Sequence, residues 1–82
     1  MTQAQFYELP LKEKVYQIFE YGQEITSRPF LYFNIKLYHI YDFFAEVWYV
    51  PSGNKIDKVE VLNIDEVLHL YKNNFDISEL LK

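Results

Sequence analysis

The sequence contains no Cys among its 82 residues, only two Gly and three Pro, and no long apolar run. The missing Cys excludes disulfides, Cys-ligated zinc and thiol nucleophiles, and it favours a reducing compartment. A membrane helix needs roughly 18 consecutive apolar residues, and no stretch approaches that length. The residues after Met1 have neither the basic nor the apolar region of a secretory signal. We therefore expect a cytoplasmic protein without a membrane partner.

Basic charge is also scarce. The 8 Lys and Arg residues are outnumbered by 12 Asp and Glu residues, which gives a net charge of −4. Proteins that bind a phosphate backbone usually carry a basic surface, and no Gly-rich phosphate loop is present either. Nucleic acid is therefore disfavoured as a partner.

Aromatic residues are abundant instead: 8 Tyr, 7 Phe and 1 Trp make up 20% of the chain. A domain this small has a thin core, and each ring can bury roughly 150–250 Å². The length allows a single domain over residues 1–82, with no linker or repeat. The rings are therefore expected to supply much of the core.

Two helices are predicted to flank the sheet. Pro10 suits the first turn of a helix and Gly22 suits a left-handed position after its end, which bounds the first helix at about 11–21. Asn63 opens a capping-box pattern, which predicts the start of the second helix. A further short helical turn is predicted at 77–81.

Alternating apolar residues predict an antiparallel meander between the helices. The predicted strands are 33–39, 43–50 and about 55–62, with Gln23–Arg28 as a candidate fourth strand. We expect three-residue hairpin loops at Ile40–Asp42 and Pro51–Gly53, the second with Gly53 in the left-handed region. This register places Lys36, Glu46 and Lys58 in one row, where opposite charges across strands are mildly stabilising.

The two faces of the predicted sheet differ. Both helices are expected to cover the face that carries the core residues Phe33, Ile35, Leu37, Phe43 and Val47. The expected fold is thus α+β, with a three- to four-stranded meander and both helices on one face. The other face stays open and carries the rings of Tyr38, Phe44 and Trp48. Three large rings on an open face exceed what solubility requires and indicate an interaction surface.

The helix–meander–helix order is also that of double-stranded RNA-binding domains. Those domains grip phosphates with a basic start of their last helix. Here that position reads Asn63-Ile64-Asp65-Glu66, which is acidic. The charge therefore contradicts the topological analogy.

Enzymatic and metal chemistry have little support. His39 and Asp42 lie close in sequence and could form part of a catalytic or small-molecule site. The Ser residues, however, occupy a strand end, a turn and a cap, and the His spacing matches no metal-ligand pattern. We predict no catalytic residue, no metal and no cofactor, and we leave open a ligand near His39.

Three segments together resemble a family of small uncharacterised bacterial proteins. They are LPLKEKVYQIFEYG, NIKLYHIYDFFAEVWYVP, and the closing NIDEVLHLY with FDISELL. The resemblance covers nearly the whole chain and centres on Leu37-Tyr38 and on Glu46 to Tyr49. It implies no activity, ligand or catalytic residue.

The sequence therefore predicts a non-enzymatic domain that binds a protein partner or a second copy of itself. The predicted binding surface consists of Tyr38, Phe44, Trp48 and Ile56, framed by Lys36, Glu46 and Lys58. The alternative is a small acidic inhibitor or immunity-type protein that acts on a basic target. Nucleic-acid binding and a small-molecule site near His39 rank below both.

Overall fold

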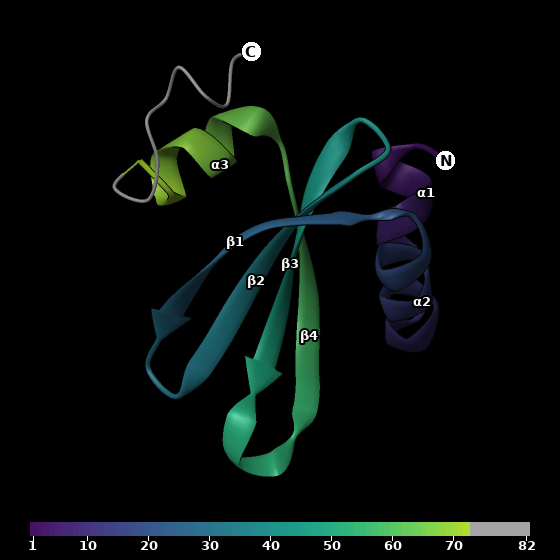
Figure 1. The fold of residues 1–82 in the computed structure, drawn as a ribbon. Coiled ribbons are helices and arrows are strands. Elements are labelled where there is room, and N and C mark those ends of the chain that lie inside the picture. The colour runs from purple at the N-terminus through teal and green to yellow at the C-terminus, as the bar shows by residue number, and fades with distance from the viewer. Residues whose placement is uncertain (73–82) are drawn as a thin grey trace.

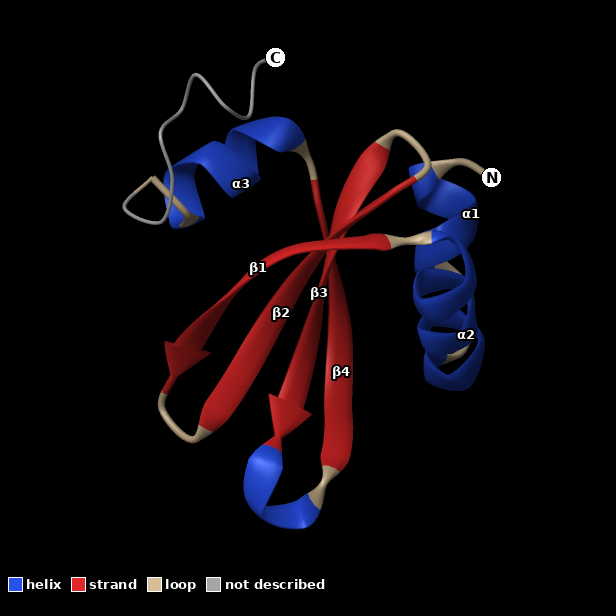
Figure 2. Cartoon of the chain, viewed as in Figure 1, coloured by secondary structure: helices blue, strands red, loops and turns tan. Residues whose placement is uncertain are grey.

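The structure, a computed structural model, describes residues 1–72, so the turn predicted at 77–81 lies outside the described residues. The elements are α1 (Gln3–Tyr7), α2 (Leu11–Tyr21), β1 (Gln23–Phe30), β2 (Phe33–Ile40), β3 (Phe43–Val50), the 3-10 helix η1 (Pro51–Gly53), β4 (Lys55–Leu62) and α3 (Ile64–Leu70) (Figure 1). The four strands form one antiparallel sheet in chain order, as Figure 2 shows. The predicted α+β class and meander are confirmed, and the candidate strand at Gln23–Arg28 is part of β1. Within residues 1–72, no helix is long and apolar enough to cross a membrane.

Helix α1 was not predicted. A capping box starts it: the Thr2 hydroxyl accepts from the Gln5 amide at 3.1 Å, and the Gln5 side chain accepts from the Thr2 amide at 2.9 Å. Its one buried residue is Phe6, whose ring lies 5.4 Å from that of Phe43. A single ring therefore anchors this short helix to the sheet.

Helix α2 has the predicted bounds, but Gly22 ends it in a different way. Gly22 is extended, with φ −88° and ψ 159°, so the predicted left-handed conformation is wrong. A Cβ at Gly22 would lie 2.6 Å from the carbonyl oxygen of Ile18, which accepts the Gly22 amide at 2.8 Å. Glycine is therefore needed here for close backbone approach, not for its freedom in φ.

The hairpin turns also differ from the prediction. Strand β2 extends through Ile40, so only Tyr41 and Asp42 remain in the turn, and Ile40 pairs with Phe43. Ile40 is completely buried in this arrangement, which a loop position would not allow. In the last hairpin, Asn54 and not Gly53 takes the left-handed conformation, with φ 48°.

The extra strand residue shifts the β2–β3 register by one position. Lys36 pairs with Val47, and Glu46 pairs with Leu37 on one side and with Glu60 on the other. The predicted row of Lys36, Glu46 and Lys58 is therefore wrong.

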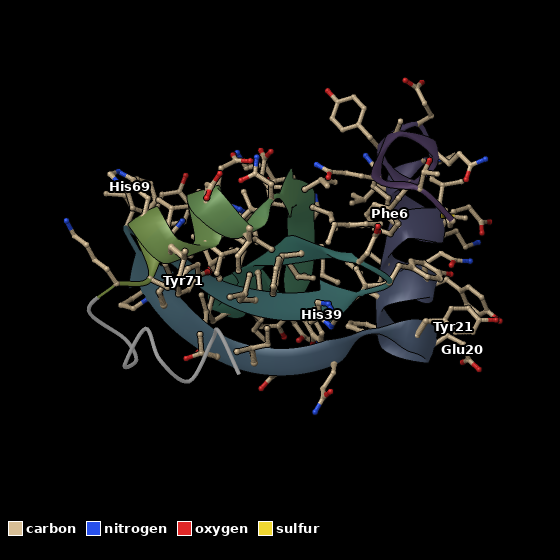
Figure 3. All side chains as sticks on the ribbon, turned by 90° about the horizontal axis from the view of Figure 1, so that it is seen from above. Phe6, Glu20, Tyr21, His39, His69 and Tyr71 are labelled. Carbon is tan, nitrogen blue, oxygen red and sulfur yellow. The ribbon has the colours of Figure 1, made fainter. Side chains whose placement is uncertain are left out.

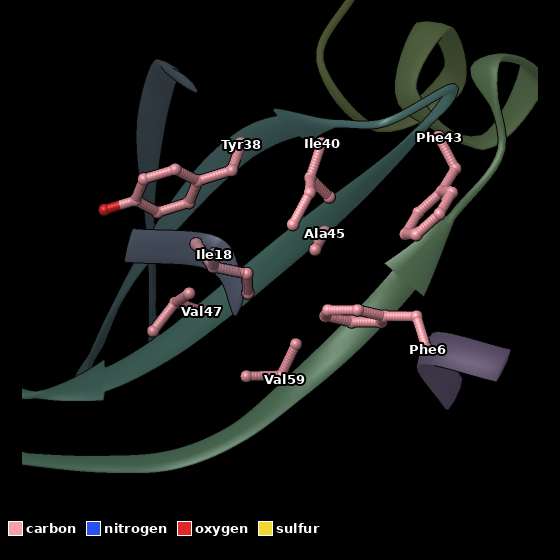
Figure 4. Packing of buried hydrophobic residues seen from close by; sticks show 8 residues of the cluster. All are labelled: Phe6, Ile18, Tyr38, Ile40, Phe43, Ala45, Val47 and Val59. Atoms are coloured by element: carbon pink, nitrogen blue, oxygen red, sulfur yellow. The ribbon is translucent and has the colours of Figure 1, made fainter. Parts of the chain in front are cut away.

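The helices cover opposite faces of the sheet, so the prediction that both lie on one face is also wrong. Helices α1 and α2 pack on a cluster that Figure 4 shows, formed by Phe6, Ile18, Tyr38, Ile40, Phe43, Ala45, Val47 and Val59. Helix α3 packs on the other face, in a cluster of Leu37, Leu62, Val67 and Tyr71. Figure 1 shows α3 and α2 on opposite sides of the strands. The cause is that β2 carries apolar residues on both faces, Leu37 on one and Ile40 on the other, and each face needs a cover.

The predicted core residues are therefore divided between the faces. Ile35, Leu37, Phe43 and Val47 are all buried, as predicted. The register places Ile35 and Leu37 on the α3 face, and Phe43 and Val47 on the α2 face. Phe33 is only half-buried, near the end of the sheet.

Candidate functional site

The structure separates the predicted binding surface into two groups. Lys36, Tyr38 and Ile56 lie on the α2 face, where Tyr38 is part of the core. The other group lies on the α3 face and consists of Phe44, Glu46, Trp48 and Lys58. A β-bulge between Trp48 and Tyr49 moves Ile56 away from the face of Trp48. The expectation of one open face that holds all of these side chains is wrong.

Glu46 is the most unexpected of these residues, because its side chain is only 2% exposed. Its Oε2 accepts from Arg28 Nε at 3.1 Å and from the Tyr71 hydroxyl at 2.5 Å. These contacts join β1, β3 and the end of α3, where Figure 3 shows Tyr71. A buried carboxylate with one cation and one phenol is well paired, so this cluster fixes α3 on the sheet.

The pKa values in this cluster are displaced in a consistent way. Burial raises the pKa of the Tyr71 phenol, and its hydrogen bond to Glu46 raises it further. Burial lowers the pKa of Arg28, but the hydrogen bonds to Tyr71 and Glu46 outweigh this and raise it. Tyr71 therefore stays a neutral hydrogen-bond donor and Arg28 stays charged. Both side chains have a structural role in this cluster, with no proton to transfer.

Trp48 lies next to this cluster, toward the turn between β1 and β2. Phe30 and Phe33 make edge contacts with it, at centroid distances of 5.7 and 5.1 Å. The Lys58 ammonium sits over the indole, 4.2 Å from the ring centroid. These side chains form one continuous aromatic cluster on the α3 face.

The turn that follows Phe30 extends the aromatic cluster into solvent. Leu31 is 79% exposed, Tyr32 is 70% exposed and Phe30 is 47% exposed. Leu31 also has φ 54°, a left-handed conformation that hairpin turns normally fill with Gly, Asn or Asp. We call the surface formed by Phe30, Leu31, Tyr32, Phe33 and Trp48 the free-end patch, because Figure 1 shows this turn at the end of the sheet away from α3.

Sequence reasoning missed most of the free-end patch. The available signal was the run Pro29–Phe33, which is PFLYF, an apolar stretch that crosses a hairpin turn whose own residues include no Gly, Asn or Asp. A turn without Gly, Asn or Asp indicates that its side chains are kept for another reason.

The group on the α2 face lines a cavity of about 350 Å³. Lys36, Tyr38 and Ile56 contribute to its wall, together with Phe19 of α2 and Tyr49 of β3. Burial raises the pKa of Tyr38, and the nearby charge and hydrogen bond of Glu24 raise it further. The phenol of Tyr38 is therefore a neutral part of the wall.

The remaining candidates do not assemble into a site. His39 is exposed, and its ring lies 5.1 Å from that of Phe44 (Figure 3 labels His39). Asp42 is exposed in the turn between β2 and β3. Among residues 1–72, no group of three His, Asp or Glu side chains could hold a metal ion.

Comparisons of this chain with protein-family models, with curated proteins and with solved structures find no match. The family resemblance seen in the sequence therefore stays a prediction, and function must be argued from the surface chemistry.

Proposed function

We propose that this chain is a non-enzymatic protein-interaction domain that binds a protein partner, or a second copy of itself, through the free-end patch. The observation that carries the proposal is Leu31, an exposed apolar residue in a left-handed conformation at a hairpin tip. That conformation costs an L-residue about 1–2 kcal/mol, and the folded monomer gains little from a side chain so exposed. An interaction outside the monomer would account for its presence.

The chemistry of the patch suits a protein surface. Trp, Tyr and Phe are enriched at interface centres, and the rings around Trp48 are already held together by their edge contacts. The nearest cations are paired within the chain, Arg28 with Glu46 and Lys58 with Glu60 at 3.1 Å in each case. Such pairs leave little net positive charge for a phosphate backbone, so the patch favours an apolar protein partner.

The sheet edges support a surface built from side chains. Strand β1 has a bulge between Glu24 and Thr26 and carries Pro29, and β4 is irregular where it pairs with Trp48 and Tyr49. Bulges and Pro are devices that prevent another strand from adding to an edge. Association by strand addition is therefore disfavoured.

A cytoplasmic location belongs to the proposal and is tested by imaging the tagged chain.

The test replaces the apolar turn residue without removing core. Leu31→Gly relieves the positive φ, so the free energy of unfolding should stay the same or rise by about 1 kcal/mol. Association should nevertheless weaken, measured as self-association by light scattering and as partner capture by affinity purification. The matched control is Tyr41→Gly, at the equivalent turn position with φ 55°, which should retain association.

If Leu31→Gly associates as the wild type does, the free-end patch is not the binding surface. The salt dependence of association then distinguishes an apolar interface from the alternative function, an acidic inhibitor. An apolar interface should change little as salt rises, whereas an acidic inhibitor of a basic target should lose association rate.

A further inference from the structure

The cavity on the α2 face is separate from the free-end patch. Its lining includes the buried Val47 of β3, Phe19 of α2 and Ile56 of β4. Trp48 and its rings lie on the opposite face of the same strand. A volume of about 350 Å³ falls within the roughly 300–1,000 Å³ that small-ligand sites occupy.

The aromatic walls of the cavity are held in place by contacts within the chain. The Tyr49 hydroxyl donates to the side-chain oxygen of Asn54, and the Tyr38 hydroxyl lies 3.5 Å from a carboxylate oxygen of Glu24. The rings of Phe19 and Tyr38 are 6.2 Å apart and tilted by 56°. A ligand would therefore meet rings that are already positioned, which reduces the entropy lost on binding.

Lys36 gives the cavity its charge. Among the described residues that line the cavity, Lys36 is the one charged side chain, and Asn34 lies two residues before it on the same strand face. Its ammonium is 3.6 Å from Glu24, and both side chains are about half exposed. Strong charge-assisted hydrogen bonds are shorter, about 2.7–2.9 Å, so this pair is weak and Lys36 can turn toward an incoming anion.

We infer that this cavity binds a small carboxylic acid with an apolar, aromatic body. The rings of Phe19, Tyr38 and Tyr49 match an aromatic group, and Val47 and Ile56 add aliphatic contacts. The Lys36 ammonium pairs with the carboxylate at the rim, and the Asn34 amide supplies a second polar contact. Binding requires no covalent step and no other ligand.

The test is an amide-resolved NMR titration of the folded chain with phenylbutyrate and, in parallel, with phenylbutanol. Phenylbutyrate should shift the amide signals of Asn34, Val47 and Ile56. It should leave unchanged the amide signals of helix α3, which covers the opposite face. Lys36→Met should weaken phenylbutyrate binding about tenfold, since a hydrogen bond to a charged group is lost. The alcohol should bind weakly to both proteins, because it lacks the charge.

Lys58→Met is the matched control. The side chain of Lys58 is 45% exposed against 42% for Lys36, and each lies near a Glu, but Lys58 is on the opposite face. This variant should bind phenylbutyrate as the wild type does. The inference is overturned if the shifts map to the α3 face, if no shift appears at millimolar ligand, or if Lys36→Met binds the acid unchanged.

Discussion

The buried phenol of Tyr71 makes a prediction that depends on pH. Its hydroxyl donates to Glu46, which keeps a second donor in Arg28. Hydrogen bonds to charged groups contribute about 1.5–3 kcal/mol to stability. Because Glu46 still accepts from Arg28 when the Tyr71 hydroxyl is removed, we expect a loss in the lower part of that range. At neutral pH, Tyr71→Phe should therefore lower the free energy of unfolding by about 2 kcal/mol. Urea denaturation followed by Trp48 fluorescence measures it.

The difference between the wild type and Tyr71→Phe should shrink at alkaline pH. The pKa of Tyr71 in the folded chain is raised above its ordinary value of 10.0. Above pH 10.0 the unfolded phenol loses its proton while the folded one keeps it, so wild-type stability falls by about 1.4 kcal/mol for each pH unit. Phe cannot titrate, and all other groups are common to both proteins. The deficit of Tyr71→Phe should therefore nearly vanish one to two units above 10.0.

Two results would refute this reasoning. Equal stability of the two proteins at neutral pH would mean that the Tyr71–Glu46 hydrogen bond contributes nothing. A deficit that stays constant through alkaline pH would mean that Tyr71 ionises as easily in the folded chain as in the unfolded one. The exposed Tyr16 supplies a control, because Tyr16→Phe should change neutral-pH stability by under about 0.5 kcal/mol.

Two further substitutions test the same architecture by urea denaturation. Arg28→Met leaves the buried Glu46 carboxylate without its cation and should cost about 3–5 kcal/mol; a cost under about 1 kcal/mol would show that Glu46 is solvated in solution. Gly22→Ala places a Cβ against the Ile18 carbonyl oxygen and should cost about 1–3 kcal/mol, whereas a neutral effect would mean that the end of α2 shifts easily.

The sequence was sufficient for α2, the strands and the start of α3, but not for α1 or for the register. The stripe of α2, the cap at Asn63 and the alternation in β3 are local signals, and each gives the observed element. The register depended on a choice between two loop lengths. A row of Lys36 and Glu46 favoured the longer loop, but exposed cross-strand pairs contribute only about 0.2–1 kcal/mol. Burying Ile40 contributes about 1.5–3 kcal/mol, so the shorter loop prevails.

The position of Glu46 could not be predicted for a different reason. Its partners Arg28 and Tyr71 are 18 and 25 residues away in the sequence. No periodicity or spacing connects such distant residues, and a Glu in an alternating strand normally faces solvent. Strand pairing brings Arg28 and Glu46 together, and the packing of α3 on the sheet adds the phenol of Tyr71. The same packing decides which rings stay exposed, so the residues predicted as one binding surface lie on two faces, and only Trp48 among them belongs to the free-end patch.

The lengths of the elements explain why an aromatic surface remains on the α3 face. Each strand has eight residues and so spans roughly 26 Å. Helix α3 has seven residues and spans only about 10 Å, so within residues 1–72 it cannot cover a whole face. The chain fills part of the uncovered region with Phe33 and Trp48, whose edge contacts and neighbouring Lys58 shield them partly from water. The Tyr32 ring also lies against Phe33, with centroids 4.7 Å apart, yet Tyr32 remains 70% exposed and Leu31 79% exposed. Most of the apolar area of these two residues is therefore left in water, and a partner surface is the environment in which it would be buried.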